Sequence, residues 1–225
     1  MAIKTIKLPD GRVLEIDEWL HWPQFSTFES AFTVGLDLRA FTYVTGQRVP
    51  NQGLVNRNAT ETDTNQVARA RMNHDEAFIV FSLTYEIWGL NDAESDASPP
   101  NNLAQAPLML PTNLRRLQRD VVVDLFVGAG ITKPMARCPL SYIGQGVGPA
   151  VNTTGPAPAA LINPGHGTGG RVYPQNQRRW NLPVYIESDR VMSLRAFSPV
   201  GVIAGLTQSY RIRWYLDGIK RRPIA

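Results

Sequence analysis

The stretch from Val184 to Pro223 most constrains how this chain can fold, because apolar and polar side chains alternate through its second half. One side of the pattern comprises Tyr210, Ile212, Trp214 and Leu216. The other side comprises Ser209, Arg211, Arg213 and Tyr215. Successive side chains of a strand point to opposite faces, so the pattern predicts a strand with an apolar row against a core and a basic row outside. Asp217-Gly218 predicts a turn after it, and the strand must pair with earlier segments of the chain.

Comparable alternation marks four further segments, at residues 31–43, 76–90, 119–127 and 184–197. In the segment 76–90 the predicted inward face is Ile79, Phe81, Leu83, Tyr85 and Ile87. In the segment 119–127 the predicted inward face is Val121, Val123, Leu125 and Val127, whereas Asp120 and Asp124 point outward. Because each pattern is apolar on one side only, each sheet is expected to be buried on one face, as in a sandwich.

The remaining segments predict turns, one aromatic cluster and very little helix. Pro9-Asp10-Gly11 separates two short apolar runs and predicts an N-terminal hairpin. Trp19, Trp22, Phe25 and Phe28 recur every three residues around Pro23, which indicates an aromatic plug under one end of a sandwich, or alternatively a ligand or partner surface. Helix is expected at most over 64–72 and as a single turn after Asn113.

These patterns predict an all-β chain: an antiparallel β-sandwich built as a single jelly roll with long loop insertions. One domain spans residues 1–225, with irregular insertions near 46–72, 91–108 and 128–182. The last insertion is rich in Gly, Pro and Ala but contains too many large apolar side chains for a solvated linker. Insertions of such length are usually functional or bound to a neighbour.

The composition is compatible with a subunit of an assembly and indicates a reducing compartment. Only 19% of residues are charged and the formal net charge is +4; a low charge fraction is expected where the surface is covered by Asn, Gln, Thr, Pro and Gly, or where it is buried by neighbouring subunits. The single cysteine, Cys138, excludes an intramolecular disulfide. The N-terminus lacks the apolar region of a signal peptide, and no window approaches about 18 consecutive apolar residues.

Enzymatic, metal and cofactor chemistry finds no support in the sequence, so we expect none of the three. His21, His74 and His166 lie far apart and form no ligand-spaced pair. Gly165–Gly170 has the spacing of a dinucleotide fingerprint, but Pro174 prevents the helix which that fingerprint must open. Carboxylates that cluster in sequence are Glu15/Asp17/Glu18, Asp92/Glu94/Asp96 and Glu187/Asp189. Their spacing does not indicate an acid/base pair.

Basic residues are the candidate binding groups. They form dispersed clusters: Arg69/Arg71, Arg115/Arg116/Arg119, Arg178/Arg179 and Lys220/Arg221/Arg222. The residues predicted to face a genome or lipid headgroups are Arg211, Arg213, Lys220, Arg221 and Arg222. The alternative is that the basic groups are solubilising or pair with aspartates of neighbouring subunits, namely Asp63, Asp120 and Asp124.

In architecture the chain resembles the jelly-roll capsid proteins of icosahedral bacteriophages and related viruses. The resemblance lies in alternating strands that carry long Asn-, Pro-, Gly- and Thr-rich excursions, and in phrases such as FTYVTGQRVP, ATETDTN and YLDGIKRRP. It implies a virion structural protein made in the host cytoplasm, a major capsid subunit whose partners are itself and other virion proteins, without a small-molecule substrate. Alternatives are a minor capsid or decoration protein, or a lectin-like carbohydrate-binding β-sandwich using Trp19, Trp22, Trp88 and Trp180.

Overall fold

A computed structural model describes residues 5–8, 11–15, 19–74, 76–90, 111–128, 133–145 and 179–221. Strands dominate this part of the chain, accompanied by one α-helix and one short 3₁₀ helix. The elements are β1 Thr5–Lys7, β2 Val13–Glu15, β3 Trp19–His21, β4 Gln24–Ser30, β5 Asp37–Ala40, β6 Asn51–Gln52, β7 Ala77–Leu90, α1 Pro111–Asp120, β8 Val122–Val127, β9 Ala136–Pro139, η1 Leu140–Tyr142, β10 Gly144–Gln145, β11 Arg179–Ile186, β12 Met192–Phe197 and β13 Ser209–Arg221.

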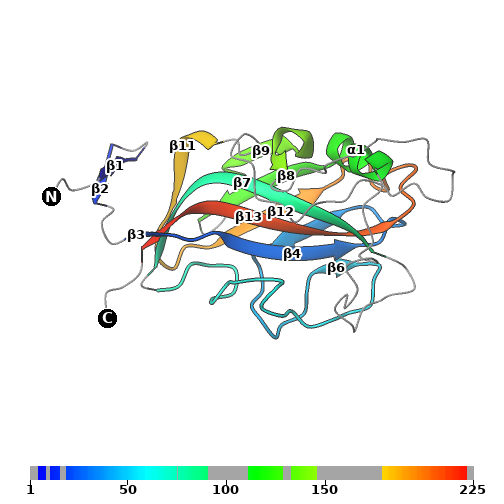
Figure 1. The fold of residues 1–225 in the computed structure, drawn as a ribbon, viewed down its shortest axis with the longest axis horizontal. Coiled ribbons are helices and arrows are strands. Elements are labelled where there is room, and N and C mark those ends of the chain that lie inside the picture. The colour runs from blue at the N-terminus through cyan, green and yellow to red at the C-terminus, as the bar shows by residue number, and fades with distance from the viewer. Residues whose placement is uncertain are drawn as a thin grey trace, which may run out of the picture.

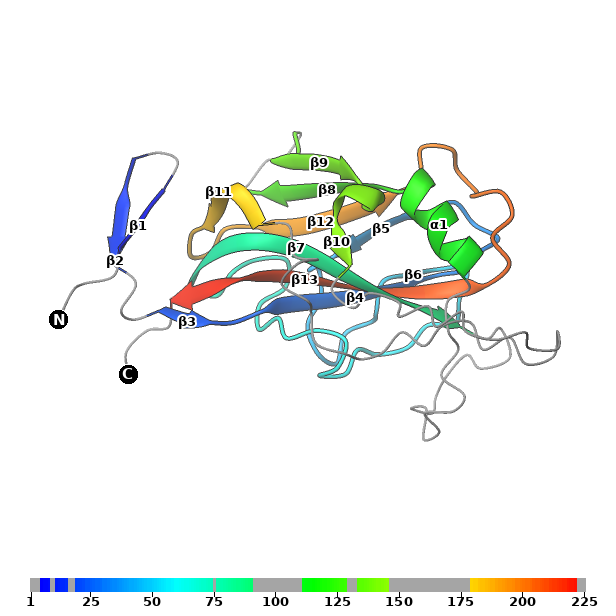
Figure 2. The ribbon, with the colours of Figure 1, turned by 45° about the horizontal axis from the view of Figure 1, so that its top comes forward.

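Apart from the separate β1–β2 pair, the strands form two sheets packed face to face, as the alternation predicts (Figures 1 and 2). The large sheet has the order β10-β7-β13-β4-β6, with β11 also paired to β7 and β3 to β13. The small sheet has the order β5-β12-β8-β9 and is antiparallel throughout. Within the large sheet only the short β10–β7 and β4–β6 pairs are parallel. The described chain is therefore an antiparallel β-sandwich.

The principal strand pairs are nested along the chain. β4 pairs with β13, β5 with β12, β7 with β11, and β8 with β9, all antiparallel. Taken in chain order, the first strand of this set pairs with the last, the second with the seventh, and so on inward. The chain is thus folded like one long hairpin whose successive pairs fall alternately in the large and the small sheet.

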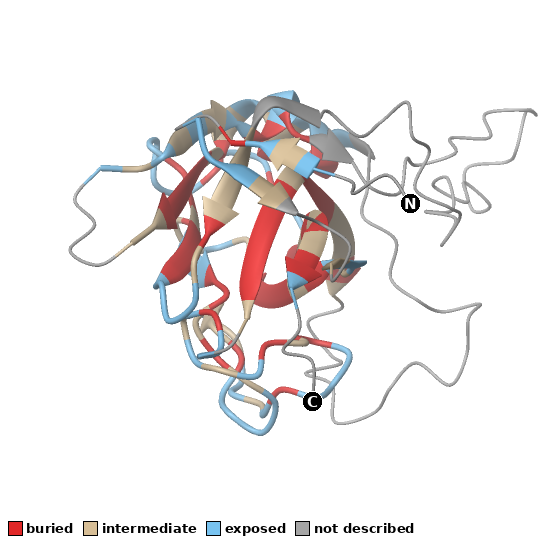
Figure 3. Cartoon of the chain, turned by 90° about the vertical axis from the view of Figure 1, so that its left-hand side faces the viewer, coloured by how far each residue is buried: buried red, intermediate tan, exposed pale blue. Residues whose placement is uncertain are grey.

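The core lies between the sheets, where inward rows from both meet (Figure 3). The four apolar residues predicted for β13 are all confirmed as buried, with exposed fractions of at most 1%. Trp214 is central: its ring lies 6.0 Å from Phe28 and 5.7 Å from Tyr85. Leu125 and Leu194 of the small sheet belong to the same cluster. Each such large side chain contributes about 2 kcal/mol through burial.

Residues 24–30 correct the prediction of an aromatic plug, because they form β4, a strand at the middle of the large sheet. Phe28 points into the core and Phe25 lies on the opposite face, beside Tyr215. Of the aromatic residues spaced by threes, Trp19 belongs to β3, whereas Phe25 and Phe28 belong to β4. Pro23 directly precedes β4, so it removes no ladder hydrogen bond from the strand.

The strand over 76–90 is confirmed as β7, but its predicted inward face is wrong at the N-terminal half. The pairing to β13 shifts between Asp217 and Gly218, so that Phe81 is an extra residue. Such a bulge reverses the side-chain phase, and Phe78 and Val80 enter the core in place of the two residues predicted there. Asp217-Gly218 accordingly makes no turn, and β13 continues to Arg221.

Three further boundaries differ from prediction. The segment 184–197 is two strands in different sheets, separated by a turn in which Asp189 has a φ of 58°. Only Asp37–Ala40 of the segment 31–43 is a strand. The predicted helical turn is the ten-residue α1, which buries Leu117 and includes two residues expected in the next strand. No helix forms over 64–72.

The N-terminal hairpin is confirmed as the antiparallel pair β1–β2, which lies at the end of the sandwich where both termini emerge (Figure 1). Arg12 joins it to the large sheet: the guanidinium lies 5.2 Å from the Tyr185 ring centroid, and Nη1 lies 3.3 Å from Glu187 Oε1. No described helix is long and apolar enough to cross a membrane.

Candidate interaction surfaces

The excursion 46–72 is fastened to the large sheet by a buried ion-pair network. Arg57 Nη2 lies 2.7 Å from both Glu29 Oε1 and Asp63 Oδ1, and the two carboxylates are only 5% and 3% exposed. Arg211 of β13 reaches the same Glu29 oxygen at 2.7 Å. The network therefore joins β4, β13 and both halves of the excursion, so that this long segment is held in place by the chain itself.

Burial by itself would raise the pKa of Asp63. Hydrogen bonds from Arg57 and from the Thr60 backbone N–H outweigh that effect and lower the pKa to about 2. The Arg57 pKa is raised, because Asp63 and Glu29 more than offset the penalty of burying the guanidinium. Asp63 therefore stays ionised in the folded protein well below the pH at which a free carboxylate is protonated.

Tyr43 provides a second attachment of the excursion. Its hydroxyl accepts from the Thr27 N–H at 3.0 Å and lies 2.6 Å from the Thr27 carbonyl oxygen, to which it donates. Burial raises the pKa of Tyr43 to about 12. With Val49 and Ala59 the ring forms a small apolar cluster separate from the main core. The excursion thus carries its own core, and we regard it as a rigid extension of the sheet.

Two of the predicted surface groups, Arg211 and Arg213, lie on the outer face of the large sheet but are already engaged. Arg211 binds Glu29 as described above. Arg213 lies 4.9 Å from the Trp88 ring and 5.7 Å from the Phe25 ring. It also lies 3.7 Å from Glu86. Charge on this face is matched within the chain.

Lys220 was predicted to face a genome or lipid headgroups, but its side chain is only 6% exposed. Its Nζ lies 2.6 Å from Glu76 Oε2 and 5.8 Å from the Trp22 ring, on the inward side of β13. Arg221 is exposed at the end of that strand, and Arg222 lies outside the described residues. Of the five residues predicted to face a genome or lipid headgroups, Arg211 and Arg213 are thus paired with carboxylates of the same chain, and Lys220 is buried.

The outer face of the small sheet carries a row of charged residues that sequence reasoning missed. Arg39, Arg195, Asp124 and Arg137 lie directly opposite one another across β5, β12, β8 and β9. Asp124, predicted to point outward to solvent, is on the outer face but is 0% exposed, because Arg137 covers it with Nε 2.7 Å from its Oδ1. We call this set, together with Asp37, the arginine face.

Aromatic rings lie beneath the guanidinium groups of the arginine face. Arg195 lies 4.5 Å from the Phe197 ring, and Arg137 lies 5.8 Å from the same ring. Arg39 lies 5.5 Å from the Phe126 ring. Cation–π contact of this kind contributes about 0.5–1 kcal/mol at exposed sites and restricts the guanidinium. The guanidinium groups of Arg39, Arg137 and Arg195 are therefore positioned by the Phe126 and Phe197 rings.

The two aspartates of the arginine face form ion pairs with only two of its three arginines. Asp37 binds Arg195, with Oδ1 2.6 Å from Nε, and the pKa of Asp37 is lowered by that hydrogen bond. Asp124 binds Arg137. Arg39 is exposed and forms no ion pair with any carboxylate in the described ranges. Three arginines against two aspartates leave one formal positive charge.

The predicted Arg69/Arg71 cluster lies beside the arginine face. Arg69 Nε donates to the Thr42 carbonyl oxygen at 3.3 Å, just past the end of β5. Arg71 forms an isolated bridge with Val191, directly before β12. Both arginines are exposed. The same edge of the small sheet thus receives two more basic side chains and becomes more positive.

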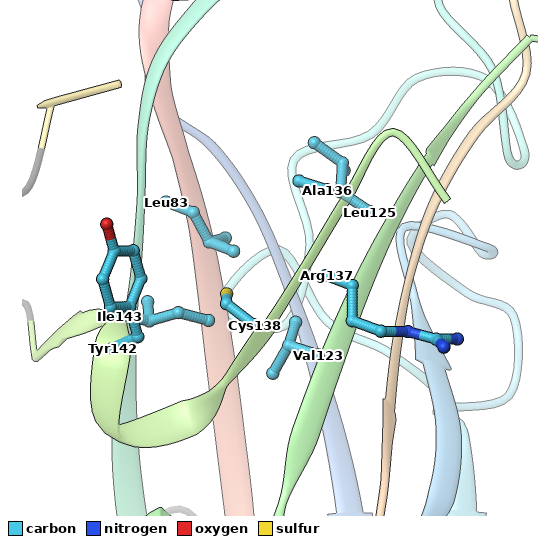
Figure 4. A pocket seen from close by; sticks show the side chains of 8 residues that line it. All are labelled: Leu83, Val123, Leu125, Ala136, Arg137, Cys138, Tyr142 and Ile143. Atoms are coloured by element: carbon cyan, nitrogen blue, oxygen red, sulfur yellow. The ribbon is translucent and has the colours of Figure 1, made fainter. Parts of the chain in front are cut away.

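An apolar cavity of about 230 Å³ opens between the two sheets beside β9 (Figure 4). Its lining residues are Leu83, Val123, Leu125, Ala136, Arg137, Cys138, Tyr142 and Ile143. Cys138 points into it, whereas the Arg137 guanidinium points away, on the other side of the strand. Burial raises the pKa of the Cys138 thiol, with a smaller effect of Asp124.

A cluster of metal-ligating side chains is not found in the described part of the chain. No cluster of three His, Cys, Asp or Glu side chains is found there. His21 and His74 are each joined to an aspartate, Asp217 at 2.7 Å and Asp189 at 2.6 Å. Glu187 binds Arg12 and Arg190. His166, the glycine motif at 165–170 and the carboxylates at 92–96 lie outside the described residues.

In comparisons with known proteins, no protein-family model, curated protein or solved structure matches the chain.

Proposed function

We propose that this protein is a jelly-roll subunit of a viral shell, a major capsid protein that associates with copies of itself. The observation that carries the proposal is the nested pairing of β4 with β13, β5 with β12, β7 with β11, and β8 with β9. A jelly roll is a sandwich in which one long antiparallel hairpin is rolled so that its pairs alternate between two sheets. This strand order supports the finer fold assignment.

Many kinds of protein have a jelly-roll fold. Two features of this chain favour a shell subunit among them: the attached excursion 46–72 and the apolar residues exposed on its connections. The sandwich is rigid, and the excursion 46–72 is fastened to it as an extension of the sheet through Arg57 and Tyr43. Several connections expose apolar side chains: Val55 and Val67 in the excursion, at 66% and 69%, and Val200 and Val202 in the β12–β13 connection, at 65% and 52%. Subunit interfaces need such apolar positions.

The carbohydrate-binding alternative is less favoured because three of the four tryptophans that it would use are in contact with other side chains. Sugar stacking requires an open ring face. Arg213 lies over the Trp88 ring at 4.9 Å, and Lys220 Nζ lies 5.8 Å from the Trp22 ring. Trp19 packs against Tyr185 with ring centroids 6.5 Å apart. Trp180 lies in β11, and its side chain is outside the described set.

Self-association is the property to test. Purified protein is examined over a range of concentrations by light scattering and then by negative-stain imaging. We expect rings, capsomers or closed shells. A protein that stays monomeric at every concentration would refute a major capsid role; recruitment of that monomer to preformed shells would then indicate a decoration protein.

The β12–β13 connection allows a sharper version of the test. Val200→Asp with Val202→Asp places two charges where we expect subunit contact, and should abolish association while leaving the melting temperature unchanged. Thr45→Asp with Asn58→Asp is the matched control, because it adds the same charge at exposed polar positions. If both variants assemble equally well, the connection is not part of the interface.

A further inference from the structure

The arginine face has an electrostatic deficit that the described chain does not satisfy. Arg39 and Arg195 are directly opposite each other on neighbouring strands, and like charges in that position repel. Asp37 compensates Arg195, with two hydrogen bonds of 2.6 and 2.7 Å. Arg39 lies over the Phe126 ring and forms no ion pair in the described chain; Asp37, which is bound to Arg195, acts on it only through longer-range Coulomb attraction. An external anion placed over the Arg39–Arg195 pair would remove the repulsion.

We infer that the arginine face binds the phosphate backbone of nucleic acid, with Arg39 as the principal contact and Arg195, bound to Asp37, beside it; a packaged genome as the source of that phosphate rests on the proposed function. Guanidinium groups match phosphate geometry with two parallel hydrogen bonds. Arg69 and Arg71 lie at the adjoining corner of the small sheet, beside Thr42 and Val191. The site is thus an exposed charged surface rather than a pocket.

The exposed groups fit a polyanion better than a protein partner. The core of a protein–protein interface presents its aromatic rings for packing against the partner. Here the rings lie under guanidinium groups: Phe126 is 7% exposed, and Phe197 is contacted by both Arg195 and Arg137. Covered rings cannot stack on bases, so contact is confined to the backbone and is independent of sequence.

The arginine face is better suited to bind phosphate than the outer face of the large sheet, where the sequence predicted the contacts. Arg211 and Arg213 are paired with Glu29 and Glu86 at 2.7 and 3.7 Å. Binding phosphate there would require breaking an internal ion pair that is partly buried. Arg39 can bind phosphate without giving up a carboxylate partner.

The test is fluorescence anisotropy with a labelled 20-nucleotide oligo-dT, measured at several salt concentrations. Subunits are kept below the concentration at which light scattering detects association. The variants are Arg39→Gln and Arg39→Gln/Arg195→Gln; neither strips a buried carboxylate of its partner, because Asp37 is 53% exposed. Arg48→Gln is the control, since it removes one exposed positive charge away from this face.

Each phosphate contact with a single strand contributes about 0.7 to the slope of log affinity against log salt. We therefore expect Arg39→Gln to lower the slope by about 0.7 and to weaken binding about eightfold at roughly 50 mM salt, with a further loss in the double variant. Thermal melting should be unchanged, and Arg48→Gln should retain the full slope.

The inference is overturned if Arg39→Gln/Arg195→Gln binds oligo-dT with the affinity and slope of Arg48→Gln. It is also overturned if the wild-type protein binds phosphatidylserine vesicles but not oligo-dT, which would assign the face to lipid headgroups. Light scattering on the same variants at higher concentration separates the two proposals. Lost oligo-dT binding with intact association supports this site, whereas oligo-dT binding without any association contradicts only the shell function.

Discussion

Replacing Arg57 with methionine tests whether the excursion 46–72 is held by its buried ion pairs. The variant removes a guanidinium that lies 2.7 Å from both Glu29 and Asp63 and substitutes an unbranched apolar chain. Glu29 keeps Arg211 as a partner. Asp63 keeps hydrogen bonds from Thr60, whose backbone N–H lies 2.9 Å from its Oδ2, but loses its counter-charge. The cost of the substitution is therefore concentrated at Asp63.

Breaking a buried pair by removing one partner typically costs about 3–5 kcal/mol. Arg57 is 21% exposed and one of its two partners is shared, so we expect the low end, about 3 kcal/mol. For a chain of this size that corresponds to a fall in melting temperature of about 6–12 °C. Arg190→Met is the control: its pair with Glu187 is solvent-exposed, at 53% and 39%, and should contribute less than about 1 kcal/mol.

The pH dependence gives an independent check with a fixed sign. The folded-state pKa of Asp63 is about 2, below its ordinary value of 3.8. The stabilisation is therefore fully present above about pH 4 and is lost as the pH falls through about 2, and it amounts to about 2 kcal/mol. Because Arg57→Met has already lost the part that Arg57 supplies, the stability difference between wild type and variant should shrink as pH falls over that interval.

Urea unfolding followed by tryptophan fluorescence measures these differences. A double-mutant cycle with Asp63→Asn isolates the coupling between the two side chains. The reasoning is refuted if Arg57→Met lies within about 0.5 kcal/mol of wild type, if the cycle gives a coupling below about 1 kcal/mol, or if the difference is the same at pH 7 and pH 3. Amide hydrogen exchange shows whether the excursion opens before the sandwich unfolds.

Two further outcomes are expected. Gly218→Ala should lower the free energy of unfolding by more than about 1 kcal/mol in the same urea assay. The reason is that a Cβ there would collide with the Ile79 carbonyl oxygen at the bulge. An unchanged free energy of unfolding would mean that β13 and β7 are further apart at this point than the structure has them. Cys138 should react with iodoacetamide more slowly than an unfolded thiol at pH 8, because burial raises its pKa; equal rates with and without urea, read by mass spectrometry, would contradict a thiol held in the cavity.

Local alternation was sufficient to predict that most strands exist and which side of β13 is buried. Trp214 and its apolar neighbours on β13 enter the core because a strand with one apolar side has a single way to bury it. The prediction failed where a partner strand changes the geometry. Phe81 is an extra residue only relative to β13, so nothing within residues 76–90 could reveal that the phase reverses there.

Neighbourhood in sequence was a poor guide to the candidate site. Arg211 and Arg213 stood out because they are close together on one strand, but Glu29 and Glu86 reach them from two other strands. Arg39, Arg137 and Arg195 are widely separated in the chain, and each has an unremarkable local context. The polar side of 31–43 already contained Asp37 and Arg39, which was the only available signal.

The sequence by itself determined the class of structure, a one-face-buried β-sandwich with long excursions, because side-chain alternation and turn residues act within a few positions of one another. The tertiary structure alone decided the strand order, the bulge and the charge balance of each face. Register brings Arg39 opposite Arg195 and buries Asp124 under Arg137. Electrostatic compensation depends on distance in space, which the order of residues along the chain does not specify.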